Sequence, residues 1–134
     1  AAEPTAAPCL LESARIGRPA VVQEQDTMMT CLRCAEISPV IWPVLTHAVD
    51  AVVTVDDERA AWAMRRLARP SAGDPEVVAG ASGACGLGAL QAIMCHDAFR
   101  SVRDRASLGP RSSILVVNTE GATDPALYRS VVGD

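Results

Sequence analysis

The stretch Gly80-Ala81-Ser82-Gly83-Ala84-Cys85-Gly86-Leu87-Gly88 contains four glycines in nine largely apolar positions. Glycine allows positive φ and lets another backbone or a flat ligand approach the main chain closely. The stretch follows the apolar residues 77–79, so it predicts the turn from a buried strand into a helix that begins near Ser82, whose unpaired N–H groups would suit an anion. Two interpretations stay open: a wall that faces a ligand, and a tight turn that needs glycine only for packing.

Working outward from this stretch, short apolar segments alternate with segments of helical spacing. We expect strands at 19–22, 51–55, 77–79 and 114–117. We expect helices at 8–16, 28–32, 57–68 and 98–105. A further helix should start at Ser38-Pro39 and be distorted by Pro43, and another should run from Asp124-Pro125 to Val132. The helix beyond Ser82 should have a core face formed by Leu87, Leu90, Ile93 and Met94. The alternation predicts an α/β fold, a layered domain with a parallel sheet that spans residues 1–134 as a single unit.

The first residues predict that the sequence starts in mid-fold. Glu3-Pro4-Thr5 has the character of the exit from a strand, while the two alanines before it provide no strand of their own. We therefore expect that strand to precede this sequence.

Composition excludes several classes of function. The net charge of −4 and the absence of a long basic run argue against nucleic-acid binding. No apolar run is long enough for a membrane span and the first residues lack the layout of a signal peptide, so a cytoplasmic location is expected. The cysteines are not spaced as a tetrahedral set, so no metal site is predicted.

All twelve basic residues are arginine, and the chain contains no lysine. A Schiff base between a protein amine and a carbonyl compound needs a lysine. The chain by itself therefore cannot form one.

In parallel sheets, ligands bind at the carboxyl ends of the strands. The turns at Gly80 and at Asn118 both follow predicted strands, and they line one crevice if those strands are neighbours. The segment 118–124 offers two hydroxyls and two carboxylates, which would suit a planar polar cofactor. The alternative is that Thr119, Thr123 and Asp124 are turn and cap residues only.

Several motifs fall in a familiar order along the whole chain: Glu3-Pro4, Cys9-Leu10, Asp26-Thr27-Met28-Met29, Cys34 with Glu36 and Ser38-Pro39, Gly73-Asp74-Pro75, Ser82-Gly83-Ala84 with Gly86-Leu87-Gly88, and Asn118-Thr119-Glu120-Gly121 with Thr123-Asp124-Pro125 and Tyr128-Arg129. In this order they resemble the C-terminal part of the diaminopropionate ammonia-lyases. Those enzymes are pyridoxal-phosphate enzymes with the tryptophan-synthase-β-like fold, called fold type II. The glycine stretch and the 118–125 turn carry most of the resemblance.

The resemblance implies a lyase that converts 2,3-diaminopropionate, a small amino acid, to pyruvate and ammonia. It also implies that the N-terminal half of the fold, with the Schiff-base lysine, the general bases and the phosphate loop, lies upstream. No catalytic residue is therefore assigned to this sequence. What carries over is the rear wall of the cofactor site, formed by Gly80, Ala81, Ser82 and Thr119, with the Thr119 hydroxyl facing the pyridine nitrogen.

Ala81 is the main departure, because the family usually has glutamate at this position. The acidic side chain beside the cofactor ring is then missing. Two hypotheses follow: a part of an ammonia-lyase that a lysine-bearing half completes, and a catalytically inert truncated paralogue that binds a small ligand or forms a homo-oligomer over an open sheet edge. A binding module unrelated to pyridoxal chemistry is a third possibility.

Overall fold

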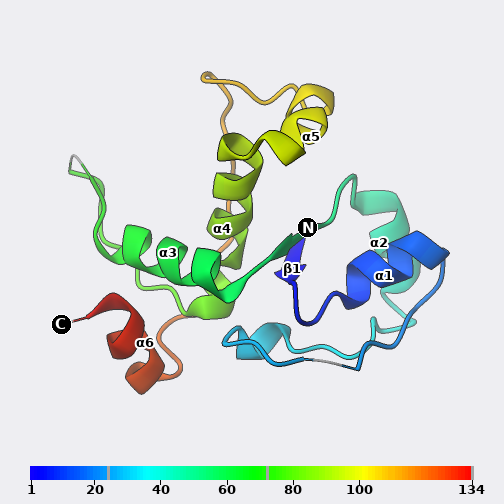
Figure 1. The fold of residues 1–134 in the computed structure, drawn as a ribbon, viewed down its shortest axis with the longest axis horizontal. Coiled ribbons are helices and arrows are strands. Elements are labelled where there is room, and N and C mark those ends of the chain that lie inside the picture. Colours follow the sequence, from blue (N-terminus) through cyan, green and yellow to red (C-terminus); the bar gives the residue numbers. More distant parts are fainter. Residues whose placement is uncertain (24, 72, 134) are drawn as a thin grey trace.

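The computed structural model describes residues 1–23, 25–71 and 73–133. Figure 1 shows a short sheet at the centre, two long helices beside it and smaller helices toward the edges. The elements along the chain are β1 (Ala2–Pro4), α1 (Cys9–Ile16), η1 (Thr30–Leu32), α2 (Trp42–Ala48), β2 (Val53–Val55), α3 (Asp57–Ala68), α4 (Ala81–Cys95), η2 (Asp97–Phe99), α5 (Arg100–Arg105) and α6 (Pro125–Val132). Within these ranges, no helix has the length and apolarity that a membrane crossing requires.

The strands β1 and β2 are parallel, with Ala2 opposite Val53 and Pro4 opposite Val55. The terminal amine of Ala1 donates a hydrogen bond of 2.7 Å to the carbonyl of Ala51, which extends the pairing by one step. The expectation that the first residues follow a strand without forming one is therefore wrong. Residues 2–4 pair because their backbone lies directly against β2, and Glu3 and Pro4 are buried there.

Glu3 connects the sheet to α1. Its carboxylate accepts hydrogen bonds from the backbone N–H groups of Leu10 (2.9 Å) and Leu11 (2.7 Å), which have no partner within the helix. Burial raises the pKa of the Glu3 carboxyl, and these two hydrogen bonds offset part of that rise. At the other end, Gly17 takes the left-handed conformation that stops the helix.

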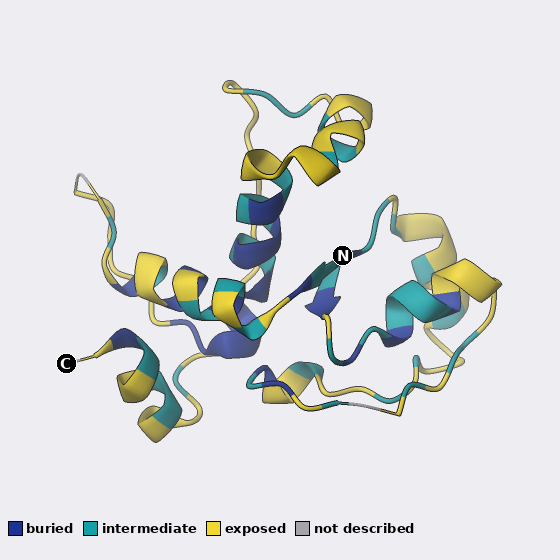
Figure 2. Cartoon of the chain, viewed as in Figure 1, coloured by how far each residue is buried: buried dark blue, intermediate teal, exposed yellow. Residues whose placement is uncertain are grey.

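The two long helices, α3 and α4, pack against each other through small residues. An added Cβ at Gly88 of α4 would lie 3.2 Å from the carbonyl oxygen of Arg59 in α3, so the two backbones approach closely. The buried positions of α4 are small as well: Ala81, Ser82, Gly83, Ala84, Cys85, Gly88, Ala89 and Ala92. Figure 2 shows these buried residues along α4 where it faces α3 and the sheet.

The predicted core face of α4 is confirmed only in part, because Leu87 and Ile93 are half-buried and pack against the hydrophobic core. Leu90 and Ile93 line an open cavity, and Met94 is 37% exposed. The fully buried positions of α4 are instead the small residues, which the close approach of its backbone to α3 at Gly88 favours.

The helix expected at Ser38-Pro39 begins later, and Pro43 does not distort it. α2 starts at Trp42, with Pro43 within its first turn. A proline is tolerated there because the first N–H groups of a helix have no internal partner. The carbonyl of Ser38 instead accepts hydrogen bonds from Ile41 and Trp42 in a turn before the helix.

Three predicted strands are absent from the described part of the chain. Residues 19–22 form only one antiparallel bridge, between Val21 and Glu36. Residues 77–79 and 114–117 belong to no strand, and Leu115 is 89% exposed. Their apolar pattern is that of buried strands, but a strand forms only where another strand offers its backbone groups.

The C-terminal helices α5 and α6 pack on α4 and α3 respectively. The guanidinium of Arg103 in α5 donates hydrogen bonds to the carbonyls of Ile93 (2.6 Å) and His96 (2.8 Å) at the end of α4. α6 packs on α3, and its first turn is capped by Asp124, whose side chain accepts from the N–H groups of Ala126 and Leu127. The predicted start of this helix is confirmed.

Replacing Asp124 by alanine should lower the free energy of unfolding by about 1 kcal/mol, because two N–H groups of α6 lose their acceptor. Urea unfolding followed by circular dichroism measures the change. The control is Asp50→Ala, an exposed aspartate whose side chain makes no hydrogen bond among the described residues. An equal effect of the two substitutions would contradict the assignment of the cap.

Candidate functional site

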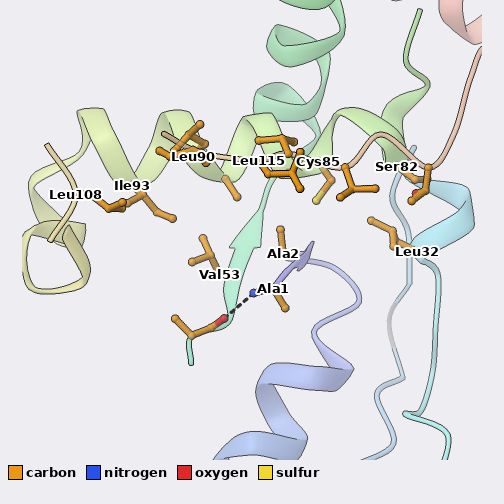
Figure 3. Close-up of a pocket in the computed structure, with 17 residues that line it drawn as sticks. Ala1, Ala2, Leu32, Val53, Ser82, Cys85, Leu90, Ile93, Leu108 and Leu115 are labelled. Atoms are coloured by element: carbon orange, nitrogen blue, oxygen red, sulfur yellow. Dashed lines mark hydrogen bonds between the residues drawn. The ribbon is translucent and has the colours of Figure 1, made fainter. Parts of the chain in front are cut away.

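A cavity of about 500 Å³ opens between the sheet, α4 and the segment 108–119. Figure 3 shows it running along α4 from Ser82 at one end to Leu108 at the other. Its lining is mainly aliphatic, and Ser82 and Thr119 are the lining residues that carry a hydroxyl. The cavity can therefore hold a flat, largely apolar group and offer hydroxyls to a polar atom on its rim.

The residues predicted for the rear wall separate into two pairs. Ser82 and Thr119 line this cavity. Gly80 and Ala81 instead line a much smaller cavity of about 10 Å³, which Tyr128 and Met64 also contact. Ala81 is 3% exposed and belongs to the hydrophobic core. The structure thus brings Ser82 and Thr119 to one site and places Ala81 behind it.

The glycine stretch lies directly against the segment Asn118–Gly121, called here the 118–121 loop. An added Cβ at Gly80 would lie 2.4 Å from the carbonyl oxygen of Gly121. At Gly83 it would lie 2.1 Å from Asn118 Oδ1 and 2.5 Å from the carbonyl oxygen of Glu120. At these two positions the 118–121 loop leaves no space for a Cβ, so packing alone accounts for the glycines.

Glu120 joins the 118–121 loop to the start of α4. Its Oε2 accepts hydrogen bonds from the N–H groups of Ser82 (2.8 Å) and Gly83 (3.3 Å). Its Oε1 accepts from the hydroxyl of Thr123 (2.7 Å) and the thiol of Cys31 (3.4 Å). A carboxylate at a helix N-terminus is stabilised by these donors and by the helix dipole.

The sequence does not single out Glu120, which counts only as one of two carboxylates in the 118–124 segment. No local pattern points to it, because the helix start that it contacts lies 38 residues earlier in the chain. Burial acts to raise the pKa of Glu120, but the hydrogen bonds from Thr123, Cys31 and Ser82 outweigh it and lower the pKa below its ordinary value. Glu120 is therefore ionised at neutral pH.

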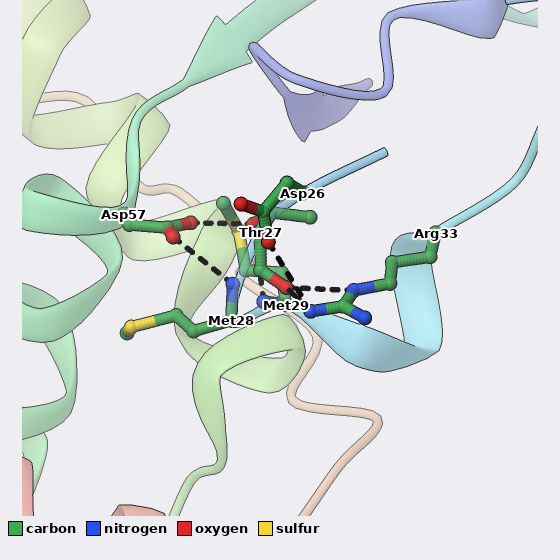
Figure 4. A network of polar contacts seen from close by, with 6 residues as sticks. All are labelled: Asp26, Thr27, Met28, Met29, Arg33 and Asp57. Carbon is green, nitrogen blue, oxygen red and sulfur yellow. Dashed lines mark hydrogen bonds and ion pairs between the residues drawn. The ribbon is translucent and has the colours of Figure 1, made fainter. Parts of the chain in front are cut away.

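A second polar network holds the segment before η1 against the start of α3 (Figure 4). The hydroxyl of Thr27 and the N–H of Met28 both donate to the carboxylate of Asp57, the latter over 3.0 Å. The guanidinium of Arg33 donates to the carbonyl of Thr27, with Nε at 2.7 Å. These contacts fix the turn that follows.

That turn, η1, borders the large cavity. The N–H of Cys31 donates to the hydroxyl of Ser82 over 3.1 Å, and Leu32 lines the cavity. Cys85 also lines the cavity, but burial and the charge of Glu3 raise its pKa to about 11. A thiol with such a pKa is neutral at physiological pH, so Cys85 is a poor nucleophile.

No group of three or more histidine, cysteine, aspartate or glutamate side chains in residues 1–23, 25–71 and 73–133 could hold a metal ion. The polar side-chain groups that line the large cavity are the hydroxyls of Ser82 and Thr119.

Replacing Gly83 by alanine should destabilise the protein by about 1–3 kcal/mol, because the new methyl group would collide with the backbone of Glu120. The higher helix propensity of alanine opposes this by up to about 1 kcal/mol. Gly109→Ala is the control, since no atom lies within 4 Å of its added Cβ. Urea midpoints measure both, and a neutral Gly83→Ala would show that the 118–121 loop can move away.

The pH dependence of stability should separate Glu120 from Glu3. The pKa of Glu120 is lowered by folding, so its contribution is present above about pH 4.5 and is lost as the pH falls through the lowered pKa. The pKa of Glu3 is raised, so its contribution is present below about pH 4.5 and is lost as the pH rises through the raised pKa. Glu120→Gln should therefore flatten the loss of stability in acid, and Glu3→Gln should steepen it.

Thermal unfolding from pH 3 to pH 8 tests both variants. Parallel curves for the two variants would contradict these opposite slopes.

The comparisons with known proteins agree with the resemblance that the motifs indicated. A family model described as "Pyridoxal-phosphate dependent enzyme" matches residues 1–120. The diaminopropionate ammonia-lyase of Escherichia coli K12 is 36% identical over 131 residues, which is 97% of this chain and 33% of that enzyme. The enzyme of Salmonella typhimurium is 34% identical over 134 residues, again with 33% of its length covered.

Solved structures give the same result. The crystal structure of the Escherichia coli diaminopropionate ammonia-lyase in complex with an aminoacrylate-PLP azomethine superposes with a TM-score of 0.84 and 35% identity, over 98% of this chain and 33% of that one. Maize serine racemase superposes with a TM-score of 0.70 and 26% identity, over 96% and 36%. The fold type II architecture is thereby confirmed.

The chain spans about a third of the length of the curated relatives it matches. The family match covers most of this sequence, from its first residue through Glu120. The chain therefore belongs to the family of pyridoxal-phosphate dependent enzymes.

Proposed function

We propose that this chain supplies one side of the cofactor site of a pyridoxal-phosphate dependent lyase, which releases ammonia from a small amino acid of the 2,3-diaminopropionate class. The observation that carries the proposal is the pair of hydroxyl residues, Ser82 and Thr119, in the lining of an apolar cavity of about 500 Å³. The identity of 36% to diaminopropionate ammonia-lyase over 97% of the chain supports the substrate class.

The residues present fit the ring of the cofactor. The aliphatic lining, including Leu90 and Val116, suits the faces of a planar heterocycle. Thr119 would donate its hydroxyl hydrogen to the pyridine nitrogen, and this neutral partner would leave the nitrogen without a proton. When bound, the cofactor supplies an electron sink for the carbanion that forms after removal of the α-proton.

The proposed cofactor-binding residues remain Gly80, Ala81, Ser82 and Thr119, and their roles differ. Ser82 and Thr119 would face the ring, since both line the large cavity. Gly80 and Ala81 would act from behind, by allowing the 118–121 loop to approach and by filling the core. No catalytic residue is assigned to this chain.

The amine that holds the cofactor covalently must come from outside this chain, because all of its basic residues are arginine. A lysine-bearing half, from another polypeptide or another segment, is the partner that the proposal requires. The unpaired apolar segment 114–117 and the cavity beside it offer the surface for such a partner or for a second copy of the chain. The cytoplasmic location stays a prediction.

A second candidate function is a catalytically inert module that binds a small ligand or forms a homo-oligomer. The burial of Ala81 favours it, because the position where the family carries an acidic side chain contributes here only to the core. The lack of lysine favours it as well.

Combining the chain with a lysine-bearing segment distinguishes the lyase proposal from the inert module. The chain is combined with the segment of the Escherichia coli diaminopropionate ammonia-lyase that it does not cover, and pyruvate formation from 2,3-diaminopropionate is measured with pyridoxal phosphate present. We expect activity from the mixture and none from either part. Thr119→Val should lower the rate about tenfold, the effect of losing one hydrogen bond of about 1.5 kcal/mol, and Thr119→Ser should retain most of it.

Circular dichroism and sedimentation confirm that both parts are folded and associated. Folded, associated parts that release no pyruvate would rule out the lyase proposal and support the inert module.

A further inference from the structure

Thr119 has no hydrogen bond of its own among the described residues, although the proposed function depends on its hydroxyl. Its side chain is exposed and free to contact a ligand. Its position is therefore set by its neighbours along the chain, Asn118 and Glu120.

Both neighbours are fixed to the start of α4 or to the segment before it. The side-chain amide of Asn118 donates to the carbonyl of Val78 over 3.1 Å. The N–H of Glu120 donates to Asn118 Oδ1 over 3.2 Å, and its carbonyl accepts from the N–H of Gly80 over 2.9 Å. The backbone on each side of Thr119 is thus held, but only by neutral hydrogen bonds.

The carboxylate of Glu120 adds charged contacts to this attachment. It accepts from the first N–H groups of α4, from the Thr123 hydroxyl and from the Cys31 thiol, while the residue as a whole is 9% exposed. Among the described residues, no arginine pairs with it, so the negative charge is held entirely by these donors. Hydrogen bonds to a charged group are about twice as strong as those between neutral groups.

The same carboxylate binds one hydroxyl residue of the cavity and belongs to the residue next to the other. Ser82 is bound directly through its N–H, and its hydroxyl in turn accepts from Cys31. Thr119 is the residue that immediately precedes Glu120. The side chain of Glu120 therefore links the segment that carries Thr119 to the one that carries Ser82.

We propose that Glu120 is a positioning residue, which holds Thr119 in the lining of the cavity by binding the N-terminal amides of α4. The proposal rests on the proposed function, in which Thr119 contacts the cofactor ring. A merely stabilising carboxylate would change the stability of the chain and leave the conformation of Thr119 unaltered.

The first test uses the 134-residue chain alone and needs no cofactor. Glu120→Gln keeps the shape of the side chain and removes its charge, and Glu76→Gln is the control, an exposed glutamate in a loop. Two-dimensional NMR follows the amide and methyl signals of Thr119, and hydrogen exchange follows the N–H groups of Ser82 and Gly83. We expect Glu120→Gln to shift and broaden the Thr119 signals and to speed exchange at Ser82 and Gly83 about tenfold, with no effect from Glu76→Gln.

Unchanged Thr119 signals in a folded Glu120→Gln variant would overturn the proposal. If that variant does not fold, Thr123→Val and Thr123→Ser decide. Thr123→Val removes a donor to Glu120 Oε1 and should shift the Thr119 signals in the same direction, and Thr123→Ser should restore them. Equal spectra for these two variants would equally overturn it.

The second test uses the assembly with the lysine-bearing segment. Glu120→Gln should lower kcat several-fold and leave KM nearly unchanged, since a misplaced Thr119 alters the reacting ring more than the capture of substrate. An active assembly in which Glu120→Gln keeps the full kcat would overturn the positioning role. An inactive assembly combined with a displaced Thr119 would reject the proposed function and leave the positioning role supported.

Discussion

The 118–121 loop lies against the first turn of α4 with no space between them for a side chain at Gly80 or Gly83. This contact joins two parts of the chain that are nearly 40 residues apart, and it places Ser82 and Thr119 on the same cavity. The charge of Glu120 strengthens this contact. The free N–H groups at the start of a helix need acceptors, and a carboxylate is a strong acceptor. The rest of the candidate site depends on this one attachment.

Features governed by local rules could be predicted from the sequence. The start of α6 at Asp124-Pro125 is an example, because the cap depends on the side chain of one residue. Features that depend on contacts with distant segments could not be predicted from the sequence. The segment 114–117 has the apolar pattern of a buried strand, but pairing needs a neighbouring strand, and the described part of the chain provides none for it.

The candidate site shows the same division. The sequence placed Ser82 and Thr119 at strand ends that would share a crevice, and the structure puts both on one cavity. It left open whether the glycines serve a ligand or packing, and the short distances to the 118–121 loop account for Gly80 and Gly83 by packing. Glu120 escaped notice because its partners, Ser82, Thr123 and Cys31, come from three separate segments of the chain.

The close approach of these backbones also constrains how the protein can change in evolution. A larger residue at Gly83 would need the backbone at Glu120 to move away, and that movement would carry Thr119 with it. A substitution at Gly83 therefore changes the lining of the cavity through Thr119, without itself contacting the cavity. The glycine stretch and the 118–121 loop can therefore be expected to vary together among related sequences, although α4 and α5 lie between them in the chain.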